Sequence, residues 1–291
     1  MKDINFSNKF KREFNWINKS ILSNILSRKK VESFEKYLFF IGTPRSGHSM
    51  VSKVLDSSSE VVITNELNIF RLKRLFYFPE KILQRFIFNE YGKHEYKESP
   101  KGGGYSLKIK NLFQGKYNTI KYIGDKKAAG TTIEYIKDRT TFESMSKPLV
   151  FVNVVRNPFD NITTIYIKSK TRELDYEKRK GLKLDKEILK DCIEVYFQLI
   201  GGAEEFSENH KVYNLKFEDI LVDPKKEFKK LFDNLGLSVT EENLNSYKNL
   251  VRKPKHNSRD SIVWPEDLIA MVEMEIEKYK TLSGYTFKDK K

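Results

Sequence analysis

Four short runs of apolar residues, rich in aromatic and β-branched side chains, recur along the chain with little alternation. Continuous runs of this kind are typical of parallel strands that are covered on both faces, whereas a half-exposed strand alternates. They occupy residues 37–41, 61–64, 122–124 and 149–155, and residues 211–217 form a fifth candidate that alternates more. The pattern predicts buried strands at these places.

Helical periodicity separates the runs. One apolar stripe at the helical spacing of about 3.6 residues is expected to end near Gly201 and Gly202. Its members are Ile188, Cys192, Val195, Tyr196 and Leu199. Because helical patterns alternate with the strands, the sequence predicts an α/β layered fold around a parallel sheet.

Capping residues predict two further helices. Asp223 before Pro224 is a typical helix start, and Gly236 stands just past the last apolar residue of that helix. Pro265 opens a last helix, which we expect to reach Tyr279.

Two regions depart from this alternation. Residues 71–110 mix aromatic residues, lysines and three consecutive glycines, and residues 168–185 form a dense run of charge without apolar periodicity. Such segments form lids and substrate walls as readily as solvated surface loops. We expect one domain at residues 37–291, preceded by a basic N-terminal helical segment at residues 1–36.

Charge and cysteine content narrow the classes of protein. The 291 residues include 54 Lys+Arg and 40 Asp+Glu, a net charge of +14 that suits a polyanionic ligand, a nucleic acid or an acidic membrane as well as an ordinary solvated lysine face. Cys192 is the only cysteine, so no disulfide can form within the chain, and we expect a reducing, cytoplasmic location.

Membrane and nucleic-acid signals are weak. No run reaches the roughly 20 apolar residues of a membrane span. Residues 16–31 place apolar side chains between basic ones, which suits a helix packed on its own domain and would also suit peripheral contact with a membrane. The sequence contains no nucleic-acid module that we recognise, so a nucleic-acid partner would rest on charge alone and is not expected.

A glycine-containing loop follows the first predicted strand and precedes an apolar helical stripe. It reads Gly42, Thr43, Pro44, Arg45, Ser46, Gly47, His48 and Ser49. Strand, loop and helix in this order form an anion site, because loop amides and the helix N-terminus converge on a bound phosphate. The spacing is that of the nucleoside-triphosphate loop G-x-x-x-x-G-K-[ST], except that His48 takes the place of the lysine. The lysine supplies a fixed positive charge on the β- and γ-phosphates, whereas histidine is only partly charged near neutral pH. The substitution therefore weighs against an ordinary ATPase or kinase.

A second motif, Arg156-Asn157-Pro158-Phe159-Asp160, follows the fourth predicted strand. Thr164 stands eight residues after its arginine. A guanidinium at a strand end and a hydroxyl two turns into the next helix can grip a phosphate together. The Asn-Pro pair is also an ordinary helix start, and an aspartate also favours a first helical turn.

Charged residues follow the second and third predicted strands. Glu66 comes after the second strand and Lys126 after the third. Because ligands of parallel sheets bind beyond the carboxyl ends of the strands, we expect Glu66, Lys126 and Arg156 on the same rim as the loop.

Together these motifs resemble those of sulfotransferases that use 3′-phosphoadenosine 5′-phosphosulfate (PAPS). The loop is similar to their 5′-phosphosulfate loop, P-[RK]-S-G-T-[TS], with His48 in place of Thr. Residues 156–164 are similar to their 3′-phosphate motif, R-[ND]-P-x-D followed by Ser, with Thr164 in place of that Ser. The resemblance implies an α/β three-layer sandwich whose central parallel sheet has P-loop, nucleoside-kinase-like topology.

The resemblance also implies roles for single residues. In tyrosylprotein sulfotransferases and related enzymes, a Glu past the second strand is taken as the base, and the loop Arg with a Lys past the third strand stabilises the transition state. Glu66, Arg45 and Lys126 hold those positions, and residues 257–261 resemble a loop with a PAPS-contacting Ser, here Ser258. The residues expected to bind PAPS are Thr43, Pro44, Arg45, Ser46, Gly47, His48, Ser49, Arg156, Thr164 and Ser258.

The leading hypothesis is a metal-independent sulfotransferase that moves a sulfuryl group from PAPS to a hydroxyl or amine and releases adenosine 3′,5′-bisphosphate (PAP). Its acceptor stays open among small molecules, carbohydrates, lipids and peptides, with residues 71–110 as an insertion on the acceptor side. Three alternatives remain. They are a nucleotide kinase or NTPase with a degenerate loop and Asp125 as metal ligand, a basic binding protein, and a PAPS-binding homologue without activity. The His48 departure keeps the last open, and His48 itself is a candidate second base.

Overall fold

The computed structural model describes residues 31–91, 109, 112–170, 184–251 and 256–289. Residues 1–30 of the predicted N-terminal helical segment, the three-glycine run and most of the charge run lie outside the described residues. Residues 31–36 are described and are not helical, and Lys36 begins the first strand. Within the described part of the chain, no helix has both the length and the apolar character needed to cross a membrane.

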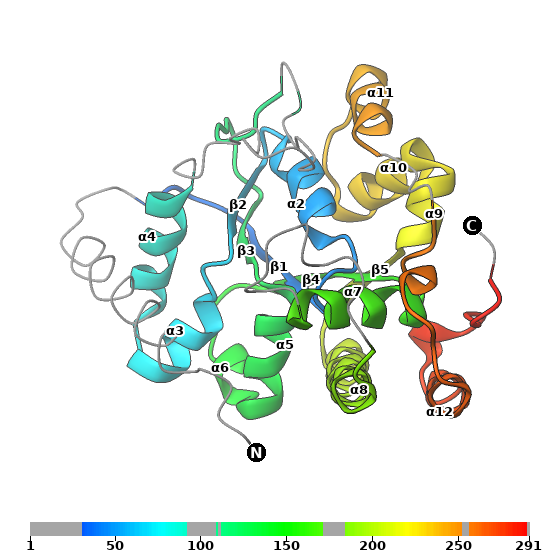
Figure 1. Ribbon diagram of the computed structural model, residues 1–291. Helices are drawn as coiled ribbons and strands as arrows, with labels where there is room; N and C mark the ends of the chain where they lie inside the picture. Colours follow the sequence, from blue (N-terminus) through cyan, green and yellow to red (C-terminus); the bar gives the residue numbers. More distant parts are fainter. Residues whose placement is uncertain (1–30, 92–108, 110–111, 171–183, 252–255, 290–291) are drawn as a thin grey trace.

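A five-stranded parallel sheet lies at the centre of the described residues (Figure 1). In chain order the strands are β1 (Lys36–Ile41), β2 (Val61–Asn65), β3 (Tyr122–Lys126), β4 (Leu149–Val155) and β5 (Lys211–Lys216). Their spatial order is β2-β3-β1-β4-β5, and every neighbouring pair is parallel. All five predicted strands are confirmed, and the loop after β1 leaves the middle of the carboxyl edge.

Partial exposure explains the weaker pattern of β5, since β2 at the other edge of the sheet is buried at four of its five positions. β1 and β3 are buried along almost their whole length, whereas in β5 only Leu215 is fully buried. A strand with a partly solvated face alternates, as the fifth run does.

Helices cover both faces of the sheet, so the three-layer α/β sandwich is confirmed (Figure 1). β1 shows the two faces directly, because Leu38 and Phe40 enter one hydrophobic cluster and Tyr37 and Phe39 the other. One face carries α2 (His48–Asp56), α9 (Phe217–Val222), α10 (Pro224–Leu235) and α11 (Glu241–Leu250). The other face carries α3 (Ile69–Phe76), α4 (Glu80–Glu90), α5 (Ala128–Lys137), α6 (Thr140–Glu143) and part of α8 (Lys186–Asn209).

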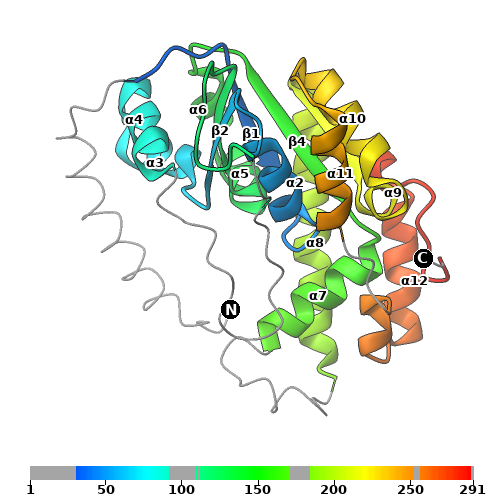
Figure 2. The same cartoon turned by 90° about the horizontal axis from the view of Figure 1, so that it is seen from above.

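A third apolar cluster joins α8 to α7 (Pro158–Lys170) and α12 (Glu266–Ile276), which lie side by side in Figure 2. Two short 3₁₀ turns, η2 (Ser258–Ser261) and η3 (Lys280–Leu282), flank α12 in the sequence. This arrangement brings the C-terminal part of the chain against α7, the helix that follows β4.

The predicted end of the α8 stripe is wrong, because the helix continues through both glycines to Asn209. A Cβ at Gly202 would lie 2.7 Å from the Ile136 side chain of α5, so the glycine allows close helix contact instead of stopping the helix. The stripe itself is confirmed apart from Val195, which is 48% exposed.

Of the two helices predicted from their capping residues, one is confirmed at both ends and the other only at its start. Asp223 caps α10 by accepting a hydrogen bond from the Lys226 backbone N–H, and Gly236 ends the helix in the left-handed conformation, as predicted. The last helix, α12, begins after Pro265 but ends at Ile276, so its predicted extension to Tyr279 is wrong.

Part of residues 71–110 belongs to the scaffold. Residues 71–76 complete α3, and α4 follows, with Leu83, Phe86 and Ile87 buried against the sheet. The expectation of an irregular excursion is therefore wrong for residues 71–90. Most of the remainder lies outside the described residues.

Candidate active site

The loop between β1 and α2 depends on left-handed backbone conformations. Gly42, Arg45 and Gly47 have φ angles of 100°, 70° and 111°. A Cβ on Gly42 would lie 2.2 Å from Asn153 Oδ1 of β4, so only glycine fits there. The Arg45 and Ser49 side chains are exposed, while those of Thr43, Ser46 and His48 are buried.

His48 lies behind the loop, with both ring nitrogens engaged. Nε2 accepts a hydrogen bond from the Val154 backbone N–H at 3.1 Å, and Nδ1 lies 3.0 Å from Ser46 Oγ, which donates to Thr43 O at 2.8 Å. Burial, with a smaller contribution from Lys126, lowers the pKa of His48 to about 3. The ring is therefore neutral and hydrogen-bonded within the protein, and the roles predicted for His48, as a phosphate contact or second base, stay predictions.

Asn161 supports the loop from α7, and the sequence reasoning missed it. Its fully buried side-chain amide turns its nitrogen toward Pro44 O at 3.0 Å and its oxygen toward the Ser46 N–H at 3.3 Å. The signal available was its place one residue after the Arg156–Asp160 motif. The two predicted motifs are thus in direct contact.

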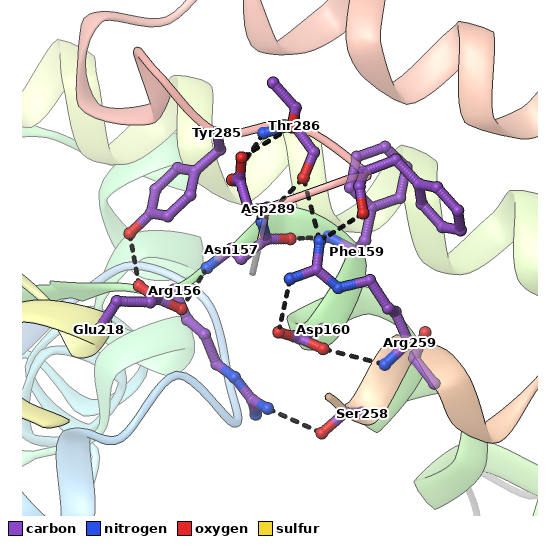
Figure 3. A network of polar contacts seen from close by, with 12 residues as sticks. Arg156, Asn157, Phe159, Asp160, Glu218, Ser258, Arg259, Tyr285, Thr286 and Asp289 are labelled. Carbon is purple, nitrogen blue, oxygen red and sulfur yellow. Dashed lines mark hydrogen bonds and ion pairs between the residues drawn. The ribbon is translucent and has the colours of Figure 1, made fainter. Parts of the chain in front are cut away.

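Arg156 and Ser258 lie side by side, although they are distant in sequence (Figure 3). Thr164 also lies beside Arg156. Arg156 Nη2 donates to Ser258 Oγ at 2.7 Å, and Nη1 lies 3.4 Å from Thr164 Oγ1 and 3.4 Å from Arg45 O. The guanidinium lies 5.4 Å from the centre of the Phe217 ring. Its Nε is buried without a hydrogen-bond partner. Burial lowers the pKa of Arg156, against the opposing effect of Asp160 and Glu218.

Glu66 and Lys126 also meet, at the ends of β2 and β3. Lys126 Nζ donates to Glu66 Oε1 at 2.5 Å, and Lys127 Nζ donates to Glu66 Oε2 at 2.6 Å. Partial burial of Glu66 favours the neutral carboxyl, but the two ammonium groups outweigh it and hold the pKa of Glu66 below its ordinary value. Lys126 also acts electrostatically on His48, which places this pair beside the loop.

Asp125 is fully committed to the turn that carries Glu66. Its Oδ1 accepts hydrogen bonds from the Leu67 N–H at 3.0 Å and from Thr64 Oγ1 at 3.1 Å, and its Oδ2 accepts one from the Asn68 N–H at 2.6 Å. Glu66 and Asn68 both have left-handed backbones, with φ angles of 66° and 59°. Asp125 therefore positions this turn instead of facing a ligand. The described residues contain no group of three or more His, Cys, Asp or Glu side chains arranged to hold a metal.

A family model described as a sulfotransferase domain matches residues 35–261 of the chain. None of the curated proteins compared with the chain matches it.

Three solved structures with similar folds share 11–13% identity with the chain. A sulfotransferase domain from the curacin biosynthetic pathway has a TM-score of 0.49, 13% identity, and coverage of 85% of this chain and 98% of that chain. A mouse sulfotransferase complexed with PAP has a TM-score of 0.46, 12% identity, and coverage of 88% of this chain and 90% of that chain. A sulfotransferase from Mycobacterium avium has a TM-score of 0.49, 11% identity, and coverage of 92% of this chain and 81% of that chain.

Proposed function

Since the chain belongs to the family of sulfotransferase domains and is an enzyme of sulfuryl transfer, we propose that its donor is PAPS, bound without a metal between the loop after β1 and Arg156. The acceptor is a hydroxyl or amine on a small molecule, carbohydrate, lipid or peptide. A reducing, cytoplasmic compartment suits the single cysteine, Cys192, which is buried and free.

The cluster of Arg156, Thr164 and Ser258 is the observation that carries the donor assignment. Arg156 is 9% exposed, forms no ion pair among the described residues, and keeps a buried Nε without a partner. Burying a cation without a paired counter-charge is costly, and Asp160 and Glu218 offset that cost only in part, since burial still lowers the pKa of Arg156. A 3′-phosphate would supply that charge and accept hydrogen bonds from the guanidinium and both hydroxyls.

The loop supports the other end of the donor. α2 begins with no side-chain cap on its first backbone N–H groups and no acidic residue in its first turn. Uncapped amides at a helix N-terminus attract an anion. The contact between Arg156 and Arg45 O joins this end to the proposed 3′-phosphate site.

The proposed chemistry is an in-line displacement at sulfur. The acceptor oxygen or nitrogen forms a bond to sulfur, the bond from sulfur to the 5′-phosphate oxygen breaks, and PAP leaves with that electron pair. Glu66, ionised at neutral pH, takes the acceptor proton. Arg45 and Lys126 stabilise negative charge on the bridging and sulfuryl oxygens.

The competing hypotheses have less support. A metal-dependent kinase would need Asp125 as a ligand, but both of its oxygens already accept hydrogen bonds from the turn at residues 64–68. An inactive homologue was suggested by His48, whose ring contacts are structural and leave Glu66, Arg45 and Lys126 in place. A basic binding protein has only net charge in its favour.

Calorimetric titration tests the proposal. We expect wild-type protein to bind PAP without Mg²⁺ and more tightly than ATP, and Arg156→Ala to weaken PAP binding by about tenfold or more, because a charged hydrogen-bonding partner is lost. Mg²⁺-dependent preference for ATP would contradict the proposal and favour a kinase.

A further inference from the structure

We propose that the buried pair Asp160–Arg259 is a positioning device for the 3′-phosphate site. It holds the Ser258 hydroxyl against Arg156, and so determines how much affinity the protein gains from the 3′-phosphate of its donor. This inference rests on the proposed PAPS site and assigns roles to two residues that do not themselves touch the ligand.

Asp160 contacts both the main chain and the side chain of Arg259. Its Oδ1 accepts a hydrogen bond from the Arg259 backbone N–H at 2.9 Å, and its Oδ2 lies 3.2 Å from Arg259 Nη2. The Asp160 and Arg259 side chains are only 1% and 4% exposed. Because the first of these contacts is to the main chain of the residue after Ser258, the carboxylate sets where the η2 turn lies and where the serine hydroxyl points.

Asp160 also contacts the second hydroxyl of the cluster. Its backbone carbonyl accepts a hydrogen bond from Thr164 Oγ1 at 2.8 Å. One residue of α7 therefore orients Thr164 through its main chain and Ser258 through its side chain. These are the two hydroxyls that lie beside Arg156.

The C-terminal segment holds the other side of Arg259 (Figure 3). Arg259 Nη1 donates to Thr286 O at 3.0 Å and to Phe287 O at 2.8 Å. Asn157, the residue after Arg156, donates from Nδ2 to the same Thr286 O at 3.1 Å and to Asp289 Oδ2 at 3.1 Å. The sequence neighbours of Arg156 and Ser258 are thus tied to one short stretch of chain.

The arrangement separates binding from positioning. The cation that faces the proposed phosphate, Arg156, forms no ion pair among the described residues, whereas Arg259 is neutralised by Asp160 and hydrogen-bonded to two carbonyls. Both terminal nitrogens of Arg259 are therefore engaged by Asp160, Thr286 and Phe287, and we infer that this residue acts through the turn it belongs to. A hydroxyl held at 2.7 Å from the guanidinium before the ligand arrives loses little freedom when it binds.

The experiment compares two ligands that differ only in the 3′-phosphate. PAP and adenosine 5′-phosphate are titrated calorimetrically into wild type, Asp160→Asn and Arg259→Lys. Arg259→Lys keeps a cation beside Asp160 but loses the planar fork that reaches Thr286 O and Phe287 O. We expect each variant to lose about tenfold or more in PAP affinity, with adenosine 5′-phosphate affinity almost unchanged. Asp267→Asn, which removes one partner of an exposed ion pair with Lys186, is the matched control and should leave both affinities unchanged.

The ratio of the two affinities distinguishes positioning from general stability. A variant that only loosens the fold should bind both PAP and adenosine 5′-phosphate more weakly. That result would overturn the inference, and so would an unchanged affinity for PAP. If single variants do not fold, the double variant Asp160→Leu/Arg259→Met replaces the ion pair by apolar side chains of similar size. It should prefer PAP over adenosine 5′-phosphate less than the wild type does.

Hydrogen exchange of wild-type protein needs no variant. The Arg259 backbone amide should exchange more slowly when PAP is bound than in the free protein, and adenosine 5′-phosphate should not have this effect. Equal slowing by the two ligands would count against the inference. If wild type shows no preference for PAP over adenosine 5′-phosphate, the proposed donor site itself fails, and the inference fails with it.

Discussion

The ring of His48 accepts a hydrogen bond from the backbone N–H of Val154, so the helix after the loop is tied to the central strand β4. An unprotonated Nε2 is required for that bond. The ordinary family residue at this position would not reach the strand in this way, because threonine has a much shorter side chain. In this chain the loop is instead supported by an imidazole, and that support depends on pH.

His48→Gln should reduce the acid sensitivity of the fold. The pKa of His48 is lowered by burial to about 3, from an ordinary value of 6.5. Between these values the unfolded chain binds a proton that the folded chain does not, so stability is complete above pH 6.5 and falls with decreasing pH by roughly 1.4 kcal/mol per pH unit. Urea unfolding at pH 7.5, 6.0 and 5.0 should show a smaller fall for the variant. An identical pH dependence would show that the ring is protonated in the folded state.

Asp125→Asn should change the pH dependence in the opposite direction. Burial raises the pKa of Asp125 to about 6, although the Leu67 and Asn68 amides and Thr64 oppose this. Between about pH 4 and pH 6 the folded state holds a proton that the unfolded state has released, so this group lowers stability as the pH rises, by roughly 1.4 kcal/mol per unit. The variant should lack that decline in unfolding experiments at pH 4.5 and 6.5. It should also lower turnover, because the turn carrying Glu66 loses a carboxylate acceptor.

Glu66→Gln should abolish most turnover without weakening the binding of the donor. Loss of a general base costs about 10²- to 10⁴-fold in rate. The affinity for PAP and the melting temperature should stay close to wild type, since the side chain is half exposed. PAP release is measured with an acceptor that the wild type sulfates, and Glu187→Gln, an exposed change on α8, is the control. Near-normal turnover with an intact fold would remove Glu66 from the mechanism.

Lys127→Met should shift the acid limb of activity. Lys127 Nζ lies 2.6 Å from Glu66 Oε2 and helps to hold the pKa of that carboxyl down. Without it the pKa of Glu66 rises, so the fall of kcat/KM at low pH should begin at higher pH, by up to about 1 unit. Lys137→Met removes an exposed lysine at the far end of α5, the helix that begins just after Lys127, and should leave the profile in place. A shift to lower pH would contradict the assignment of Glu66 as the base.

Asn161→Ala should weaken the binding of PAP and of adenosine 5′-phosphate to a similar extent. The amide faces Pro44 O and the Ser46 N–H within the loop proposed for the 5′ end, which PAP and adenosine 5′-phosphate share. Loss of these contacts should reduce both affinities by about tenfold. This pattern differs from that expected for Asp160→Asn, where only PAP is affected. Selective loss of PAP in Asn161→Ala would place the amide in the 3′-phosphate site instead.

The strands and the position of the loop could be predicted because they depend on local pattern. Apolar runs such as residues 149–155 and the Gly42–Gly47 spacing are properties of adjacent residues. The partners of His48 and Asp160 could not be found in this way. Val154 lies 106 residues from His48, and Arg259 lies 99 residues from Asp160. Such contacts depend on strand order and on the path of the C-terminal segment.

The errors in helix ends have a related cause. Gly201 and Gly202 look like a stop in sequence, but α5 packs against that side of α8, and tertiary contact outweighs the local preference. α4 was missed because its basic and aromatic residues obscure an apolar face that becomes clear only against the sheet.

The contacts of Arg259 with Thr286 and Phe287 also bear on how the protein is made. A nascent chain exposes its phosphate loop early, but it lacks these two carbonyl groups until residue 287 has left the ribosome. Tight donor binding would therefore be acquired only after residue 287 has been made, so PAPS could not stabilise the folding steps that come before it.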